Sequence, residues 1–203
     1  MPITIISTTL FALGFLLIFY ILVCIKAKHL VIPHSKTLFV YITIFSLFGI
    51  VGEVFVNTLY TAILGSPLWE YRLFPAHNGN ISYFFLFIWG SLGVYKYFSD
   101  QVLFANYKLT ELQAGLLMGA EAVFLELLYN GVYFLIFGDY IFYYLPANLG
   151  PLSHLSCLQV IPFYFMVGFF ATKLIAHHAK LPTSKSLYAF YWMIIITFVF
   201  LIK

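Results

Sequence analysis

Two stretches of the chain carry the same polar pattern inside long apolar runs. Residues 53–71 read EVFVNTLYTAILGSPLWEY, and residues 126–144 read ELLYNGVYFLIFGDYIFYY. Six of the nineteen aligned positions are identical, namely Glu53, Asn57, Tyr60, Ile63, Gly65 and Tyr71 with Glu126, Asn130, Tyr133, Ile136, Gly138 and Tyr144. Positions i, i+4 and i+7 share one helix face, so Glu, Asn and Tyr form a polar stripe on each of two apolar helices.

The composition around these stripes is that of a membrane protein. Of the 203 residues, 63% are hydrophobic and 8% are charged, and the mean hydropathy is +0.99. A soluble domain carries roughly 25% charged residues, so the bilayer must be the solvent for most of this chain. We therefore expect an all-α, polytopic integral membrane protein, with residues 1–203 forming a single membrane domain. The lipid bilayer is its main expected partner, and no nucleic acid is expected.

Six apolar runs are long enough to cross the hydrocarbon core as helices. They cover residues 3–25, 38–64, 81–98, 112–137, 155–176 and 186–202. Thr110 with Gln113 predicts a capping box at the start of the fourth span, and Gly115 with Gly119 predicts a close-packing face on it. Pro162 falls inside the fifth span and predicts a kink there.

The basic residues predict the orientation of these spans. The linkers after the first, third and fifth spans hold Lys26, Lys28, Lys36, Lys96, Lys108, Lys173, Lys180 and Lys185. The opposite side holds only Arg72 and Lys203. By the positive-inside rule, both termini and the loops 65–80 and 138–154 lie on the non-cytoplasmic side. No basic residue precedes Ile3, so we expect residues 3–25 to be a retained first span and not a cleaved signal.

The matching stripes belong to a longer predicted repeat of helix, aromatic loop and helix. The two copies cover about residues 49–93 and 122–168, and the spans 3–25 and 186–202 flank them. Both copies start on the same side, which predicts parallel repeats about an axis along the membrane normal. Glu53 and Glu126 should then converge on one interior site in the outer half of the bilayer. Two close carboxylates in a low dielectric do not readily both ionise, so one stays protonated or a cation lies between them.

An acid inside a membrane span is costly and by default marks a function, which makes the two glutamates the leading candidates. The full set of candidate ligand-binding residues is Glu53, Asn57, Tyr60, Glu126, Asn130, Tyr133, Trp69, Tyr71 and Arg72. Interhelical packing is the alternative role for the stripe asparagines and tyrosines. Interfacial anchoring is the alternative for Trp69 and Tyr71. Arg72, the single arginine, could bind a phosphate or carboxylate, or pair with Glu70. Glu121 lies on another helix face, and its role is open.

Metal, cofactor and redox chemistry receive little support from the sequence. His77 and His154, with Glu53 and Glu126, could form a site of two histidines and two carboxylates. Their spacing matches no known metal motif, so the sequence itself predicts no metal and leaves any cofactor unknown. Cys24 and Cys157 lie far apart, and no structural disulfide is expected. The chain also lacks a phosphate-binding loop, so nucleotide hydrolysis is not expected.

Part of the first copy resembles a known family. The matching features are a mid-helix acid, an aromatic-acid-tyrosine triplet, an Asn-Gly element with a following isoleucine and a Trp-Gly, here Glu53, Trp69-Glu70-Tyr71, Asn78, Gly79, Ile81, Trp89 and Gly90. Over about residues 49–93 the chain resembles the CmpB-type ABC-transporter permease family of small membrane proteins. The family tends to have an arginine where this chain has Asn80. The resemblance implies a transport role, with a separate ATPase subunit or other membrane proteins as partners.

Three functions fit these observations. The leading one is a transport or ligand-handling component for a lipid-like or small amphiphilic molecule, with an intramembrane site built from the two copies. The second is a membrane-embedded lipid-modifying enzyme that uses the glutamates and histidines, with or without a metal. The third is a structural subunit of a larger membrane complex, in which the polar stripes only join helices.

Overall fold

A computed structural model describes residues 4–107, 109–146, 148–180 and 185–200, and it is 74% helical. The helices are α1 (Ile5–Ala27), α2 (Ser35–Leu64), α3 (Phe85–Phe98), α4 (Glu111–Phe137), α5 (Val160–Lys180) and α6 (Lys185–Phe200). The strands are β1 (Trp69–Tyr71), β2 (Pro75–Ala76), β3 (Ile81–Ser82) and β4 (Phe142–Tyr144). Short turns of 3₁₀- or π-helix are His77–Gly79, Ser99–Leu103 and Gly150–Leu152.

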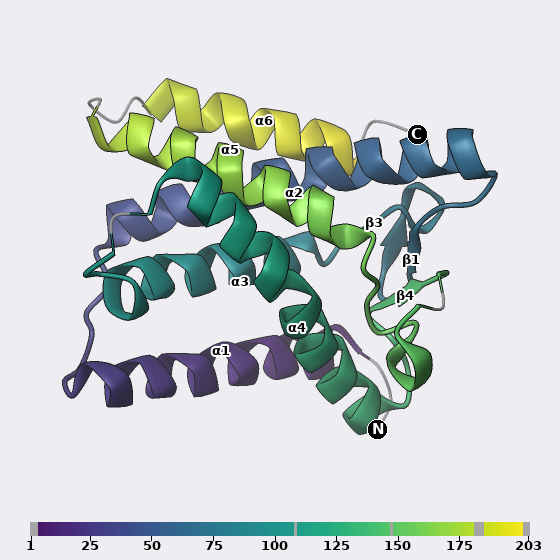
Figure 1. The fold of residues 1–203 in the computed structure, drawn as a ribbon, viewed down its shortest axis with the longest axis horizontal. Helices are drawn as coiled ribbons and strands as arrows, with labels where there is room; N and C mark the ends of the chain where they lie inside the picture. The colour runs from purple at the N-terminus through teal and green to yellow at the C-terminus, as the bar shows by residue number, and fades with distance from the viewer. Residues whose placement is uncertain (1–3, 108, 147, 181–184, 201–203) are drawn as a thin grey trace.

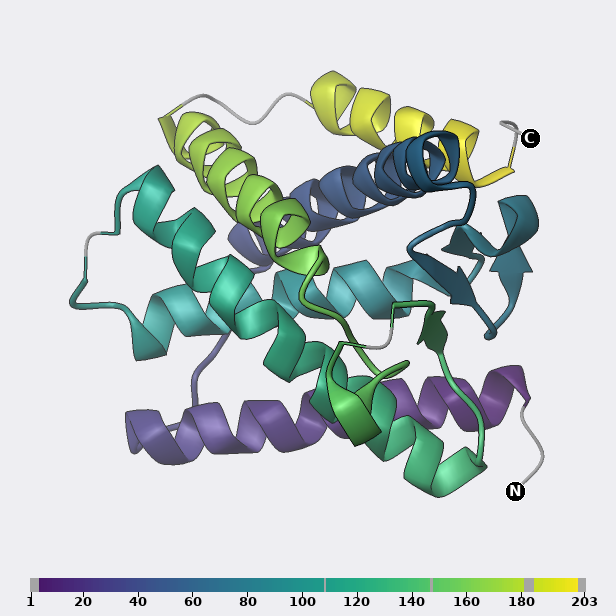
Figure 2. The ribbon, with the colours of Figure 1, turned by 45° about the vertical axis from the view of Figure 1, so that its right-hand side comes forward.

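The helices form a bundle with the strands gathered at one end (Figure 1). In both ribbon views α3 lies between α1 on one side and α2 with α6 on the other (Figure 2). The start of α1 and the end of α6 lie at the same end of the bundle as the strands (Figure 1). The loops that follow α2 and α4 therefore meet beyond the helices that carry the two polar stripes.

Local signals in the sequence explain where several helices begin and end. Thr110 accepts a hydrogen bond from the Gln113 backbone, and the Gln113 side chain accepts one from the Thr110 backbone, which confirms the predicted capping box of α4. α2 and α4 end at Gly65 and Gly138, whose φ angles are 77° and 75°. Glycine adopts this left-handed conformation without the steric penalty of a Cβ, so both stripes end in the same kind of turn.

Within the described part of the chain, four helices are long and apolar enough to cross a membrane. They are α1, α2, α4 and α5, the last over Val160–His178. α3 has 14 residues and α6 has 16, which gives lengths of roughly 21 and 24 Å, less than the ~30 Å of a hydrocarbon core. The predicted third span began at residue 81, but Ile81–Ser82 pair with β2 instead. The Ser82 hydroxyl donates to the Leu73 carbonyl at 2.6 Å, which holds this segment in the loop.

The predicted kink at Pro162 is wrong. α5 begins at Val160 and not at residue 155, so Pro162 lies in the first turn of the helix. Backbone N–H groups in a first turn have no partner within the helix, so a proline there removes no hydrogen bond.

Small residues let α4 and α5 approach closely, as predicted for Gly115 and Gly119. A Cβ on Gly115 would lie 2.9 Å from the Phe165 carbonyl oxygen, and one on Gly119 would lie 3.1 Å from the Ile161 carbonyl oxygen. α1, in contrast, packs mainly against α3 and Ser99–Leu103, and most of its surface is exposed.

Lys96 does not belong to an exposed linker. It lies in the last turn of α3 and is 5% exposed. Its Nζ is 3.9 Å from Asp100 Oδ1 and 3.8 Å from Glu121 Oε2, and the Tyr41 hydroxyl donates to Asp100 Oδ2 at 2.8 Å. Lys96 is therefore a buried charge with two acidic neighbours, and Glu121 is one of them. Lys108, Lys203 and the Lys180 side chain lie outside the described residues.

A two-stranded antiparallel ribbon of β1 and β4 links the two loops. Trp69 pairs with Tyr144, Glu70 with Tyr143, and Tyr71 with Phe142. The sequence predicted aromatic loops here and no strands, because three residues are too few to show an alternating pattern. The ribbon holds the loop after α2 against the loop after α4.

Candidate functional site

Glu53 and Glu126 lie at one small cavity between the helices and the ribbon. Glu53 is 3% exposed and Glu126 is 7% exposed. The rest of the cavity wall is mostly aromatic and consists of Trp69, Tyr71, Ile88, Trp89, Phe142, Tyr144, Phe163 and Tyr164. Its volume is about 10 Å³, close to the smallest space that holds one water molecule. The structure thus brings together the two glutamates whose convergence the sequence pattern predicted.

Glu126 is held by three hydroxyl groups. Its Oε1 accepts hydrogen bonds from the Tyr144 hydroxyl at 2.6 Å and the Tyr164 hydroxyl at 2.8 Å. Its Oε2 accepts one from the Ser156 hydroxyl at 2.6 Å. Both oxygens therefore act as acceptors, and the side chain is fixed in one orientation.

Glu53 has fewer partners. Its Oε1 accepts a hydrogen bond from the Tyr71 hydroxyl, while its Oε2 is buried with no hydrogen-bond partner among the described residues. The indole Nε1 of Trp89, on the same cavity, is also buried and unpaired within the described part of the chain. A buried polar atom without a partner costs about 1–3 kcal/mol. The Trp89 side chain nevertheless interacts with Glu53, so a further group at this cavity would meet an acceptor and a donor that face each other.

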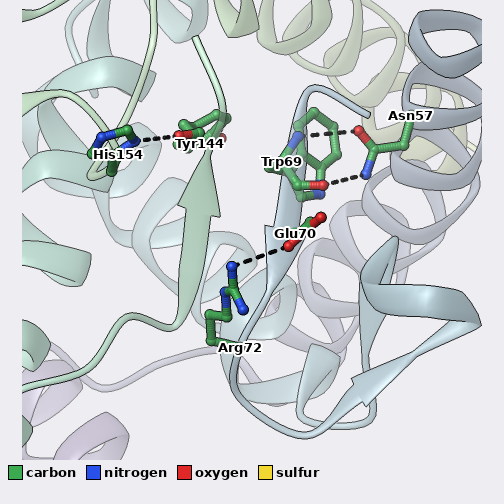
Figure 3. Close-up of polar contacts among 6 residues, drawn as sticks. All are labelled: Asn57, Trp69, Glu70, Arg72, Tyr144 and His154. Atoms are coloured by element: carbon green, nitrogen blue, oxygen red, sulfur yellow. Dashed lines mark hydrogen bonds and ion pairs between the residues drawn. The ribbon is translucent and has the colours of Figure 1, made fainter. Parts of the chain in front are cut away.

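Asn57 on α2 positions Tyr71 at Glu53. Its Oδ1 accepts the Leu68 backbone N–H at 2.9 Å, and its Nδ2 donates to the Trp69 carbonyl at 2.9 Å. Figure 3 shows the contact between Asn57 and Trp69. The contacts of Asn57 with Leu68 and Trp69 hold the loop back over α2. The Tyr71 hydroxyl therefore reaches Glu53, which lies one helical turn before Asn57.

Asn130 on α4 positions Tyr144 at Glu126 by the same contacts. Its Oδ1 accepts the Ile141 N–H at 2.9 Å, and its Nδ2 donates to the Phe142 carbonyl at 2.8 Å. These four pairs of residues are each 73 positions apart (57 and 130, 68 and 141, 69 and 142, 71 and 144), whereas the second acceptors of the two amides, Asn80 Oδ1 and the Leu155 carbonyl, do not correspond. Both asparagines are fully buried and occupied by backbone groups, so they position the site and do not line the cavity.

Both tyrosine hydroxyls at the glutamates are proton donors. Burial raises the pKa of Tyr71 well above its usual value, and Glu53 raises it further when it is ionised. Burial and Glu126 raise the pKa of Tyr144 in the same way. Because both hydroxyls keep their protons, each continues to donate to its glutamate at any physiological pH.

The third members of the stripes lie elsewhere. Tyr133 is buried against Phe11 and Phe137, with ring centroids 5.2 and 4.5 Å away. Tyr60 is half-buried on α2 and does not line the cavity. Tyr60 and Tyr133 lie two helical turns beyond the acids, past the cavity, and pack against neighbouring side chains.

Arg72 lies outside the cavity. Its Nη2 is 3.1 Å from Glu70 Oε2, the pair drawn in Figure 3, and its side chain is 49% exposed. Its guanidinium carbon lies 5.3 Å from the centre of the Tyr143 ring. The structure places Arg72 in a surface ion pair at the ribbon.

The structure does not bring His77 and His154 to the two glutamates. His77 Nε2 lies 3.0 Å from the Val199 carbonyl oxygen. His154 Nδ1 lies 2.7 Å from the Tyr144 carbonyl oxygen, the contact shown in Figure 3, and its ring stacks on Tyr143. Within the described ranges, no group of three or more His, Cys, Asp and Glu side chains could hold a metal ion.

A larger cleft lies beside the small cavity. Its volume is about 510 Å³, within the ~300–1,000 Å³ range of small-molecule sites. It lies between α1, α3 and α4, and apart from Glu121 and Glu126 its walls are almost wholly apolar, with residues such as Phe15, Phe19, Leu92, Met118 and Leu128. The residues that line both the cleft and the cavity are Ile88, Trp89, Glu126, Phe142 and Tyr164. The polar cavity therefore adjoins a cleft of the size and character that suit an alkyl chain.

Several residues of the site were not among the candidates predicted from the sequence. Tyr164 and Ser156, which bind Glu126, come from α5 and the loop before it. Nothing in the spacing of the repeat pointed to Tyr164, because its contact depends on how α5 packs on α4. Trp89 stood out only in the family resemblance. Tyr144 belonged to the repeat and could have been chosen by its correspondence with Tyr71.

Comparisons of the chain with family models, with curated proteins and with solved structures found no match. The resemblance to the CmpB-type permeases over residues 49–93 thus stays a prediction, and the function has to be inferred from the geometry of the site.

Proposed function

We propose that this protein is a six-span membrane protein that takes an amphiphile from the bilayer and holds it for transport or transfer. The alkyl chain lies in the cleft between α1, α3 and α4, and the polar group lies at Glu53 and Glu126. The single observation that carries this proposal is that Glu126, Trp89 and Tyr164 line both the cleft and the cavity.

The membrane assignment is supported by α1, α2, α4 and α5, which are long and apolar enough to cross a bilayer. α3 and α6 complete six spans if the bilayer thins locally or the flanking residues reach to the interface, as short spans do. Lys26, Lys28 and Lys36 in the first linker support a cytoplasmic location for that end of the bundle.

The internal duplication is the second part of the proposal. It is supported by the sequence identities and by hydrogen bonds that recur with a shift of 73 residues, from asparagine to the loop backbone and from tyrosine to glutamate. A duplicated origin explains why two acids from different helices are presented to one cavity. The ribbon of β1 and β4 then joins corresponding loops of the two copies.

An amphiphile fits this site better than a fully polar or fully apolar ligand. An apolar cleft provides favourable burial of an alkyl chain, at about 25 cal/mol per Å² of apolar surface removed from water. For an alkyl chain that enters the cleft from the bilayer and not from water, this gain is small, because lipid tails are as apolar as the cleft. Selective binding must therefore come from the polar end, and the glutamates with Trp89 supply its partners.

Filling the cleft tests this proposal. Leu128 lines the cleft and is 42% exposed on α4, so Leu128→Trp places an indole where the alkyl chain would lie. Leu135 is on the same helix, is 82% exposed and does not line the cleft, so Leu135→Trp is the matched control. We expect native mass spectrometry of gently extracted protein, titrated with dodecanol, to detect the adduct in the wild type and in Leu135→Trp but not in Leu128→Trp. Equal adducts in all three proteins, or none in the wild type, would contradict the proposal.

A further inference from the structure

The cavity holds two acids and no base. Among the residues that line it in the described structure, Glu53 and Glu126 are the only carboxylic acids, and no side chain is lysine, arginine or histidine. Two carboxylates this deeply buried are not both ionised without a compensating positive charge. The compensating charge is therefore either a proton on one acid or a cation from outside the chain.

The two acids are not equivalent. Three hydroxyl donors fix Glu126 as an acceptor, whereas Glu53 has one donor and an unpaired buried Oε2. A protonated carboxyl group has one O–H to donate, and an ionised one can accept additional hydrogen bonds. Glu53 is thus the acid that can exchange a proton for a cation.

The walls of the cavity favour a compact cation. Trp69, Trp89, Tyr71, Tyr144 and Phe163 surround the acids with aromatic rings, and a cation over an aromatic ring is attracted by the ring quadrupole. With a volume of about 10 Å³, the cavity admits a group about the size of a water molecule, such as –NH₃⁺. A trimethylammonium group is several times larger.

We propose that the polar group held at Glu53 and Glu126 is the primary ammonium of a long-chain amine. This inference rests on the proposed function, because it names the head group of the amphiphile whose chain occupies the cleft. The neutral amine arrives from the bilayer and takes the proton of the Glu53 carboxyl group. An N–H bond forms as the O–H bond breaks, which leaves –NH₃⁺ between two carboxylates and no change in net charge. The ionised Glu53 Oε2 can then accept hydrogen bonds from the ammonium and from Trp89 Nε1.

The chain contains its own reporter of this cavity. Of its three tryptophans, Trp69 and Trp89 line the cavity, and Trp192 is on α6, where its Nε1 donates to Thr43 Oγ1. In a Trp192→Phe background, all intrinsic tryptophan fluorescence comes from the cavity. The protein is placed in phosphatidylcholine nanodiscs and titrated with dodecylamine, dodecanol or dodecyltrimethylammonium, and affinities are expressed per mole fraction in the membrane.

We expect dodecylamine to change the fluorescence with an affinity about tenfold or more above that of dodecanol, as a charge-assisted hydrogen bond would give. Dodecyltrimethylammonium, which has the same charge but a larger head group, should bind no better than dodecanol. Glu53→Gln should reduce the affinity for the amine to that for the alcohol. Glu70→Gln removes an acid from the exposed ion pair with Arg72 and should leave the preference unchanged.

The outcomes separate this inference from the proposed function. If amine and alcohol bind equally by fluorescence, and Leu128→Trp removes both adducts in native mass spectrometry, the cleft binds amphiphiles and the ammonium assignment is wrong. If sodium chloride alone produces the fluorescence change and removes the preference for the amine, the site binds an inorganic cation and the assignment is also wrong. If none of the three amphiphiles binds, the proposed function fails and the inference fails with it. The ligand series uses unaltered glutamates, so it decides the question even if Glu53→Gln does not fold.

Discussion

At the scale of single residues, the asparagines of the two stripes hold the loops that carry the site and do not contact a ligand themselves. Each fixes a loop by accepting a backbone N–H and donating to a backbone carbonyl. Asn130→Ala would leave the Ile141 N–H and the Phe142 carbonyl buried without this partner, at about 1–3 kcal/mol each. We expect a clearly lower unfolding temperature in thermal denaturation followed by circular dichroism, together with weaker amphiphile binding. Asn106→Ala, at an exposed asparagine, should change neither. An Asn130→Ala protein as stable as the wild type would show that the loop does not depend on this side chain.

At the scale of elements, the contact between α4 and α5 decides whether Tyr164 reaches Glu126. The same substitution at two glycines of α4 tests this contact. A Cβ on Gly131 would meet Leu155 at an ordinary 3.7 Å, whereas one on Gly115 would overlap the Phe165 carbonyl at 2.9 Å. Alanine is favoured over glycine inside a helix by about 1 kcal/mol, so we expect Gly131→Ala to raise the unfolding temperature. Gly115→Ala should lower it and weaken ligand binding, because α5 must move away and take Tyr164 with it. Equal stabilisation by both would mean that the two helices are not in close contact at Gly115.

At the scale of the whole molecule, the proposed six-span arrangement would place the strands and the site at the non-cytoplasmic end. Ser66, after α2, and Asn106, after α3, are both exposed and would lie on opposite sides of the membrane. In a protein with Cys24→Ala and Cys157→Ala, we expect a membrane-impermeant thiol reagent applied to whole cells to label Ser66→Cys. Asn106→Cys should be labelled only after the membrane is opened. Labelling of both positions from the same side would rule out this topology.

The sequence by itself determined the features that a few neighbouring residues encode. Hydropathy gave the apolar helices, and Thr110 with Gln113 gave the start of α4. Identical spacing singled out Glu53 and Glu126, and both line the cavity, as do the predicted candidates Trp69 and Tyr71. These signals are local or repeat at a fixed interval, so they can be seen before any packing is known.

Only the tertiary structure decided which groups meet the two glutamates. Tyr164 and Ser156 reach Glu126 because α5 packs on α4, and the asymmetry between the two acids follows from those contacts. Tyr133 belongs to the repeated stripe and Arg72 could bind an anion, but both lie away from the cavity. Lys96, which a linear count places in a linker, is buried between two acids. The physical reason is that helix packing brings together residues far apart in the chain, and no periodicity within a single helix specifies its partner.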